Sequence, residues 1–259
     1  MTAVEVHHVL SGPTDAPVLL LNNSLGSNTR MWDPQVPALA ERYRVVRYDL
    51  RGHGRSPAPD GPYTLADMAD DALALLDRLD VDRAHVVGLS LGGMVSMQLA
   101  ATAPERVDRM VLCCTSAYLQ PAAGWRDRAA TVRADGIGAV AEAVVGRWLT
   151  PAFAATSPTL VANLRAMVEA TPDEGYASCC EAIAAMDLRP RLRDITAPTL
   201  LIAGSDDPAI PADHATAIAA ELPNARVVVV GPAAHLANVE QPEAIGQYIL
   251  SHLMDGDPI

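Results

Sequence analysis

Short apolar segments rich in β-branched residues recur along the chain, and longer segments with helical periodicity separate them. Apolar segments of about four to eight residues are typical of parallel strands that are covered on both faces. Their alternation with helices predicts β-α-β units, and therefore an α/β fold with a doubly wound, mostly parallel sheet. The predicted strands are residues 18–22, 43–49, 84–88, 109–114, 199–204 and 225–230.

The segment YTLADMADDALALLDRLDV at 63–81 has the clearest helical period. Thr64 and Asp67 match a capping box in which aspartate replaces the usual glutamate. A second helix is predicted after Ser90, where LGGMVSMQLAATAP continues until Pro104 helps to end it. The apolar face predicted for the first helix comprises Leu65, Met68, Ala69, Ala72, Leu73, Leu76 and Leu79.

The pattern changes between residues 117 and 194. This stretch is rich in alanine and short helical patterns, contains no convincing strand, and carries Trp125 and Trp148. We interpret 117–194 as a helical cap inserted between two strands of a single core domain, which comprises 1–116 and 195–259. The last residues, DGDPI at 255–259, are predicted to be a disordered tail.

Length and composition fit one large globular domain, because 259 residues that are half apolar can bury a sizeable core. No apolar segment approaches the roughly 20 residues that span a bilayer. The start, MTAVEVHHVL, lacks a basic region followed by an apolar one, so no secretion signal is predicted. We therefore expect a cytoplasmic protein.

The formal net charge of −12 disfavours nucleic acid and anionic membranes as partners. The chain has 19 basic residues besides histidine, and all of them are arginine. Schiff-base chemistry through a lysine is therefore excluded, and an anionic ligand must be bound by arginine, histidine or backbone N–H groups.

The cysteines form two adjacent pairs, Cys113-Cys114 and Cys179-Cys180, which do not match a C-x-x-C metal or redox motif. We interpret them as reduced, buried packing residues. His7 and His8 have no partner at zinc-site spacing and are predicted to be strand residues. Neither a metal nor a cofactor is predicted.

Ser90 lies within HVVGLSLGGMV, with Gly88 two positions before it and Gly92 two positions after it. This G-x-S-x-G pattern is typical of the sharp strand-to-helix turn that presents a nucleophilic serine above a sheet. On its own the pattern is weak, because glycine and serine also form ordinary turns. A catalytic serine also needs a base and an acid that orients the base.

Both partners follow predicted strands in the order serine, acid, histidine that α/β-hydrolases use. Asp206 and Asp207 follow the strand 199–204, and His235 follows the strand 225–230. The carboxyl ends of parallel strands share one sheet edge, which predicts a site where these residues meet Ser90. The alternative is that Asp207 only caps a turn and His235 is an ordinary loop residue.

The whole chain resembles the α/β-hydrolase-fold family and, more narrowly, the 3-oxoadipate enol-lactonases. The motifs that carry this resemblance are LLLNNSLGSNTRMWDPQVPAL, RYDLRGHGRSPAPDGPYT, VVGLSLGGMV, AGSDDPAIP and AAHLANVEQP. The resemblance implies a catalytic aspartate directly before proline, which selects Asp207, and an oxyanion hole formed by the backbone N–H groups of Leu25 and Leu91. Asn23-Ser24 stands where many relatives have His-Gly. We expect His53, in RGHGRS, to shape the wall of the site.

The resemblance implies hydrolysis of 3-oxoadipate enol-lactone through a serine acyl-enzyme, with a small anionic lactone or ester as substrate. A cap arginine would then bind the carboxylate, and Arg133 with Trp148 is our first choice for lining the site. The other cap arginines considered are Arg126, Arg128, Arg147 and Arg165. The alternatives are another carboxylesterase or lactonase, a carbon–carbon bond hydrolase, a cofactor-free perhydrolase, and a non-catalytic ligand-binding protein.

Overall fold

The computed structural model describes residues 2–254, so the tail predicted at 255–259 lies outside the described residues. The sheet has seven strands in the order β1-β3-β2-β4-β5-β6-β7, and every neighbouring pair except β1 and β3 is parallel. The predicted α/β fold with a mostly parallel sheet is confirmed. The strands are β1 (His8–Ser11), β2 (Val18–Asn22), β3 (Arg44–Tyr48), β4 (Ala84–Leu89), β5 (Val107–Cys113), β6 (Thr199–Gly204) and β7 (Ala225–Val230).

The central strands are buried on both faces, as their continuous apolar sequences require. Leu20 of β2 and Val86 of β4 pair with each other and have no exposed surface. The strand β1 is the one antiparallel member of the sheet and pairs with β3 at its edge, where His8 lies opposite Tyr48.

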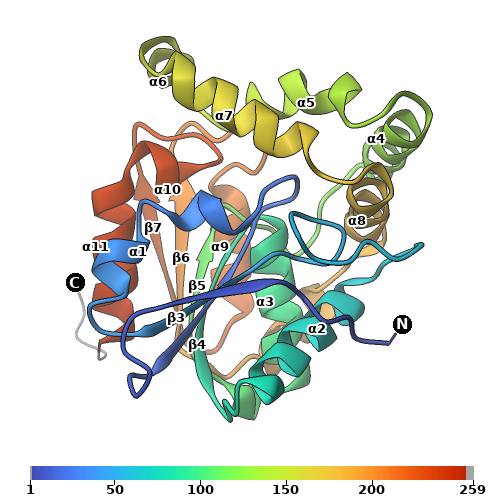
Figure 1. Cartoon of the computed structure of the whole chain (residues 1–259). Helices are drawn as coiled ribbons and strands as arrows, with labels where there is room; N and C mark the ends of the chain where they lie inside the picture. Colours follow the sequence, from blue (N-terminus) through green and yellow to red (C-terminus); the bar gives the residue numbers. More distant parts are fainter. Residues whose placement is uncertain (1, 255–259) are drawn as a thin grey trace.

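Helices cover both faces of this sheet (Figure 1). In Figure 1, α1 and α11 lie on one side, and α2 and α3 lie on the other. The core helices and 3-10 turns are η1 (Thr29–Trp32), α1 (Val36–Leu39), α2 (Leu65–Arg78), α3 (Leu91–Thr102), η2 (Pro104–Arg106), η3 (Arg189–Asp194), α9 (Asp213–Glu221), α10 (Ala237–Glu240) and α11 (Pro242–Leu253).

The helix α2 begins with the predicted capping box. The Thr64 hydroxyl accepts from the Asp67 N–H, and the Asp67 carboxylate accepts from the Thr64 N–H. The buried face differs from the predicted one: Leu75 is buried, whereas the predicted Leu73 and Leu79 are half-buried and Leu79 lies just past the end of the helix. Asp71 is also buried in this face because it forms an ion pair with the buried Arg51.

Only helices and loops connect β5 to β6 in the described chain. The helices α4 to α7 lie together along the top of the molecule in Figure 1, apart from the helices that flank the sheet. The helix α5 packs on α7, and α4 packs on α8, the last helix of this segment. The limits 117 and 194 remain a prediction. The five helices are α4 (Ala122–Asp135), α5 (Gly138–Val145), α6 (Pro151–Thr156), α7 (Pro158–Glu169) and α8 (Asp173–Ala185).

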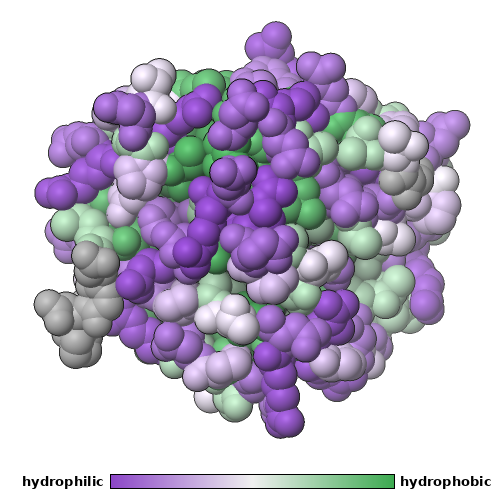
Figure 2. All heavy atoms as spheres, turned by 90° about the horizontal axis from the view of Figure 1, so that it is seen from below, coloured by the Kyte–Doolittle hydropathy of each residue, from purple (hydrophilic) through white to green (hydrophobic). Residues whose placement is uncertain are grey.

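The surface away from these helices is mainly hydrophilic, with apolar residues in small groups (Figure 2). None of the helices within residues 2–254 is sufficiently long and apolar to cross a membrane. The four cysteines are free and buried: Cys113 and Cys114 lie at the end of β5, and Cys179 and Cys180 lie on α8.

Candidate active site

Ser90 occupies a sharp turn between β4 and α3. Its backbone has φ 56° and ψ −118°, in the left-handed region that most side chains avoid. The two flanking glycines make this turn possible, because a Cβ on Gly88 would lie 2.3 Å from the carbonyl oxygen of Gly92. A Cβ on Gly92 would lie 2.3 Å from the carbonyl oxygen of Asn22. The G-x-S-x-G spacing therefore follows from steric needs of the turn.

Asp207 and His235 form a buried pair at the ends of neighbouring strands. The Nδ1 atom of His235 lies 2.8 Å from Oδ2 of Asp207. The other carboxylate oxygen accepts the N–H groups of Ala209 and Ile210, at 2.8 and 3.0 Å. The carboxylate is thus fixed on both sides, and it orients the imidazole so that Nε2 remains for another partner.

The adjacent acid, Asp206, has a different environment. Its side chain is exposed and accepts a hydrogen bond from the hydroxyl of Ser205, whereas its N–H donates to the carbonyl of Ala233. Asp206 is therefore a turn residue, and Asp207 is the acid that contacts the histidine.

Ser90 and His235 line one cavity of about 430 Å³, a size that suits a small organic ligand. Among the described residues, the Ser90 hydroxyl makes no hydrogen bond. Catalytic hydrogen bonds are often long or misaligned before substrate binds. The remaining lining residues are Ser24, Leu25, Gln120, Pro121, Gly124, Trp125, Arg128, Val144, Arg147, Trp148, Tyr176, Pro208 and Ala209.

The two backbone N–H groups expected to form the oxyanion hole belong to Leu25 and Leu91. Leu91 directly follows Ser90 as the first residue of α3, where the N–H has no partner within the helix. Leu25 lines the cavity, and its N–H donates to no acceptor in the described part of the chain. In place of a His-Gly pair, the loop has Asn23, whose side-chain amide donates to the carbonyl of Tyr48 at 2.6 Å and so ties the loop to β3.

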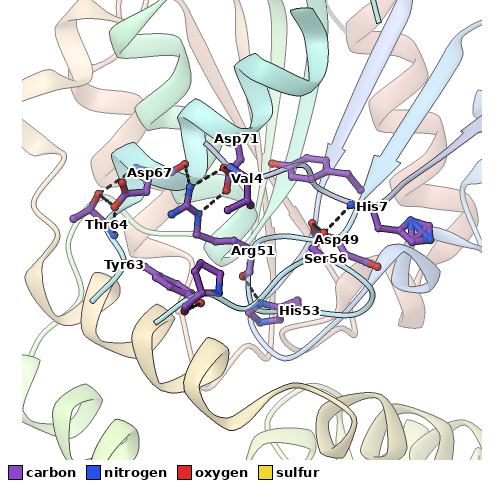
Figure 3. A network of polar contacts seen from close by, with 12 residues as sticks. Val4, His7, Asp49, Arg51, His53, Ser56, Tyr63, Thr64, Asp67 and Asp71 are labelled. Atoms are coloured by element: carbon purple, nitrogen blue, oxygen red, sulfur yellow. Dashed lines mark hydrogen bonds and ion pairs between the residues drawn. The ribbon is translucent and has the colours of Figure 1, made fainter. Parts of the chain in front are cut away.

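His53 forms a hydrogen bond with the loop that carries Leu25. Its Nε2 atom accepts the N–H of Gly26 at 2.9 Å, and its Nδ1 atom lies 3.2 Å from the carbonyl oxygen of Arg51. Burial lowers the pKa of this histidine, so the neutral ring needed to accept from Gly26 is favoured. Figure 3 shows Arg51 between His53 and helix α2, where it pairs with Asp71 at 2.6 Å.

The cap is joined to the loop that carries His235. The N–H of Leu236 donates to the carbonyl of Trp148 at 2.8 Å. The buried carboxylate of Glu240 accepts the N–H of Ala234 at 2.5 Å through one oxygen. Through its other oxygen it accepts the N–H and the hydroxyl of Thr150, at 2.9 and 2.6 Å. The orientation of the histidine is therefore linked to the position of the cap.

The structure corrects one predicted substrate contact. Trp148 lines the cavity, but Arg133 does not; it lies on the outer surface and forms ion pairs with Glu174 and Glu181, at 2.8 and 2.6 Å. These acids come from α8, 41 and 48 residues along the chain, so local sequence gave no indication of the pairing.

The cap residues at the cavity are instead Arg128 and Arg147, together with Trp125 and Tyr176. The position of Arg147 beside Trp148 was the signal in the sequence that could have favoured it. No sequence pattern singled out Tyr176, which reaches the cavity from α8.

The fold and the site define an α/β-hydrolase: a serine at a strand-to-helix turn lines the same cavity as a histidine that contacts an aspartate, at the edge of a mostly parallel sheet. The chain belongs to the α/β-hydrolase fold family, whose model matches residues 17–242.

Three similar proteins extend this assignment. The 3-oxoadipate enol-lactonase 2 of Acinetobacter baylyi is 37% identical over 246 residues, which cover 95% of this chain and 92% of the relative. The protein named "Putative carbamate hydrolase RutD" of Stutzerimonas stutzeri is 34% identical, with 96% and 97% covered. The crystal structure of the enol-lactonase from Burkholderia xenovorans LB400 is 39% identical, with a TM-score of 0.95 and coverage of 98% and 99%.

Proposed function

We propose that this hydrolase opens 3-oxoadipate enol-lactone to 3-oxoadipate through a serine acyl-enzyme. The observation that carries the proposal is the buried contact between His235 and Asp207 at the cavity that Ser90 also lines. The full-length similarity to two proteins named enol-lactonases supports the choice of substrate.

In the first half-reaction, Ser90 Oγ attacks the lactone carbonyl while His235 Nε2 takes the hydroxyl proton. Asp207 holds the Nδ1–H tautomer and favours the charged imidazolium that results. The N–H groups of Leu25 and Leu91 stabilise the tetrahedral oxyanion, each contributing on the order of 3 kcal/mol. Cleavage of the bond between the acyl carbon and the ring oxygen then leaves the acyl group on Ser90.

The leaving group is an enolate oxygen on the same molecule. An enolate leaves more readily than an alkoxide, and it becomes the ketone when a carbon atom takes up the proton that His235 removed from Ser90, passed directly or through solvent, which returns the imidazole to its neutral form. Water activated by His235 then attacks the acyl-enzyme, and Ser90 recovers its proton as the new carboxylate leaves.

The Ser90→Ala variant tests the proposal by the loss of ultraviolet absorbance of the conjugated enol-lactone. Alanine fits the buried turn, so we expect an unchanged circular dichroism spectrum and a kcat reduced by several orders of magnitude. Turnover near that of the wild type in a folded variant would refute the serine mechanism.

Parallel assays of the wild type with a simple aryl ester and with a carbamate test the substrate. We expect the enol-lactone to have the highest kcat/KM. A preference for the carbamate would instead assign the activity in the name of the Stutzerimonas stutzeri relative.

A further inference from the structure

A chain of buried hydrogen bonds ends at the turn that carries Ser90. The Tyr48 hydroxyl donates to Oδ1 of Asn22, and Nδ2 of Asn22 donates to Oγ of Ser96 at 2.9 Å. The Ser96 hydroxyl then donates to the carbonyl oxygen of Gly92 at 2.7 Å. Tyr48, Asn22 and Ser96 have no exposed surface, so water does not compete for these bonds.

The donors and acceptors of this chain fit together in one way. The carbonyl of Gly92 can only accept, so the Ser96 hydroxyl must donate to it and accept from its other neighbour. Asn22 therefore turns its NH₂ group towards Ser96 and its carbonyl oxygen towards Tyr48. Burial raises the pKa of Tyr48, so its hydroxyl keeps the proton that it donates. Removal of either hydroxyl leaves a buried group of Asn22 unpaired.

The chain joins the two elements that carry the expected oxyanion donors. Asn22 is the last residue of β2, and the loop after it contains Leu25. Gly92 follows Leu91 in the first turn of α3. The backbones of the two elements are also in close contact, since a Cβ on Gly92 would lie 2.3 Å from the carbonyl oxygen of Asn22. Movement of Asn22 or Ser96 would therefore move the two donors relative to each other.

Tyr48 is a second anchor for the Leu25 loop. Its carbonyl oxygen accepts from Nδ2 of Asn23 at 2.6 Å, whereas its hydroxyl donates to the preceding Asn22. Two consecutive residues, where β2 meets the loop, are thus bound to the end of β3. An oxyanion hole needs such precision, because both donors must lie about 2.7–3.1 Å from the oxyanion and a displacement of about 1 Å can cost about 10²-fold in rate.

We propose that Asn22, Tyr48 and Ser96 are positioning residues for the oxyanion hole, because they hold its two backbone N–H groups at the separation that an oxyanion requires. None of the three lines the cavity, so they act through the backbone and do not touch the substrate. This inference rests on the proposed function, since acyl transfer to Ser90 is the step that develops an oxyanion between the two donors.

The variants Ser96→Ala and Tyr48→Phe each remove one hydroxyl and test the proposal with 4-nitrophenyl acetate. The burst of 4-nitrophenolate in stopped flow separates the acylation rate constant from the dissociation constant of the ester. We expect both variants to lower the acylation rate constant about tenfold and to leave the dissociation constant unchanged, since a lost donor costs about 10²-fold or more and a displaced one costs less. Phenylboronic acid, which adds to the serine hydroxyl as a tetrahedral anion, should bind more weakly to both by a similar factor.

The matched control is Thr199→Val. The buried Thr199 hydroxyl donates to the carbonyl of Ala197 at 2.8 Å at the start of β6, the end away from the site. This variant should lower the melting temperature, as the other two do, and leave acylation unchanged.

Unchanged acylation in both Ser96→Ala and Tyr48→Phe would overturn the positioning role even if Ser90 hydrolyses the lactone. Conversely, the expected losses in a protein that does not open the enol-lactone would retain the positioning role and reject the proposed substrate. A wild type that gives no burst and binds no boronic acid would reject both.

Discussion

Asp206 and Asp207 are adjacent carboxylates whose surroundings give them different tasks. Asp207 is buried against His235, whereas Asp206 is exposed in a turn. In Asp207→Asn, the amide faces Nδ1 either with its NH₂ group, which cannot accept a hydrogen bond, or with its carbonyl oxygen, which accepts more weakly than a carboxylate. The Nδ1–H tautomer of His235 is then no longer favoured. We expect Asp207→Asn to lower kcat by about 10³-fold or more, and Asp206→Asn to leave it almost unchanged.

Steady-state kinetics of both variants on the enol-lactone measure this ranking, with near-ultraviolet circular dichroism as the control for folding. A larger loss in the Asp206 variant would show that the contact at 2.8 Å between Asp207 and His235 is not the catalytic one.

His53 is a positioning residue for the oxyanion loop. It accepts the N–H of Gly26, the residue after Leu25, so its removal releases the loop that carries one proposed oxyanion donor. We expect His53→Leu to lower kcat about tenfold with little change in KM, since a full donor contributes about 10²-fold or more. His53→Gln retains an acceptor and a donor and should restore most of the rate.

Rates for the two His53 variants, measured with the enol-lactone over a pH series, distinguish positioning from packing. A role in packing alone predicts equal losses for leucine and glutamine, and that result would reject the positioning role.

Residue chemistry could be predicted from sequence where topology determines it. Ser90, Asp207 and His235 each follow a strand, and parallel strands bring their carboxyl ends to one edge. The cap arginines lie on helices, or in the turn after α5 in the case of Arg147, and the sequence does not specify how these elements pack together. Arg133 was therefore a wrong choice, because its acidic partners Glu174 and Glu181 come from a helix far along the chain.

At the scale of elements, one buried carboxylate reinforces the connection between the cap and the His235 loop, beside the hydrogen bond from the Leu236 N–H to the Trp148 carbonyl. Glu240 accepts from Ala234 on the core side and from Thr150 on the cap side. In Glu240→Gln, the NH₂ group faces one of these donors and leaves it unpaired, at a cost of about 1–3 kcal/mol. We expect a lower melting temperature together with a lower kcat/KM on the enol-lactone.

The exposed Glu243→Gln on α11 is the matched control, because it removes the same charge from the same region. In thermal melts and in kinetics on the enol-lactone, Glu240→Gln should have a lower melting temperature and a lower kcat/KM than Glu243→Gln. Equal behaviour would mean that the cap and the loop hold their positions without Glu240.

Strands and capped helices can be predicted from this sequence, because hydrophobic periodicity and capping hydrogen bonds depend on residues that are close together in the chain. The six parallel strands agree with the prediction to within about two residues. The prediction of strand residues at His7 and His8 is confirmed only for His8, since β1 begins there. The extent and antiparallel direction of β1 are not predicted, because a short edge strand has little apolar signal. The burial of Asp71 on α2 was missed, since its partner Arg51 comes from a loop before the helix.

At the scale of the whole molecule, buried neutral histidines oppose stability in acid. Burial lowers the pKa of His53, His85 and His252, the last to about 4 from its usual 6.5. His252 joins α11 to the sheet through a contact of 3.1 Å between Nε2 and the carbonyl of Pro198. Each of these rings is neutral in the folded protein at neutral pH.

The lowered pKa of His252 means that the folded protein loses stability as the pH falls. Because its folded value lies below the unfolded one, the unfolded chain binds a proton first as the pH falls. The contribution of this histidine is complete above about pH 6.5 and is lost as the pH falls towards 4. Because the side chain is buried, the loss is on the order of 3 kcal/mol.

The variant His252→Gln keeps a donor for the Pro198 carbonyl and cannot titrate. Urea unfolding from pH 7 to pH 4.5 should therefore give a shallower loss of unfolding free energy than in the wild type. The half-buried His8→Gln on the edge strand is the control and should follow the wild-type curve. Identical slopes for His252→Gln and the wild type would assign acid sensitivity to other groups, with His53 and His85 the next to test.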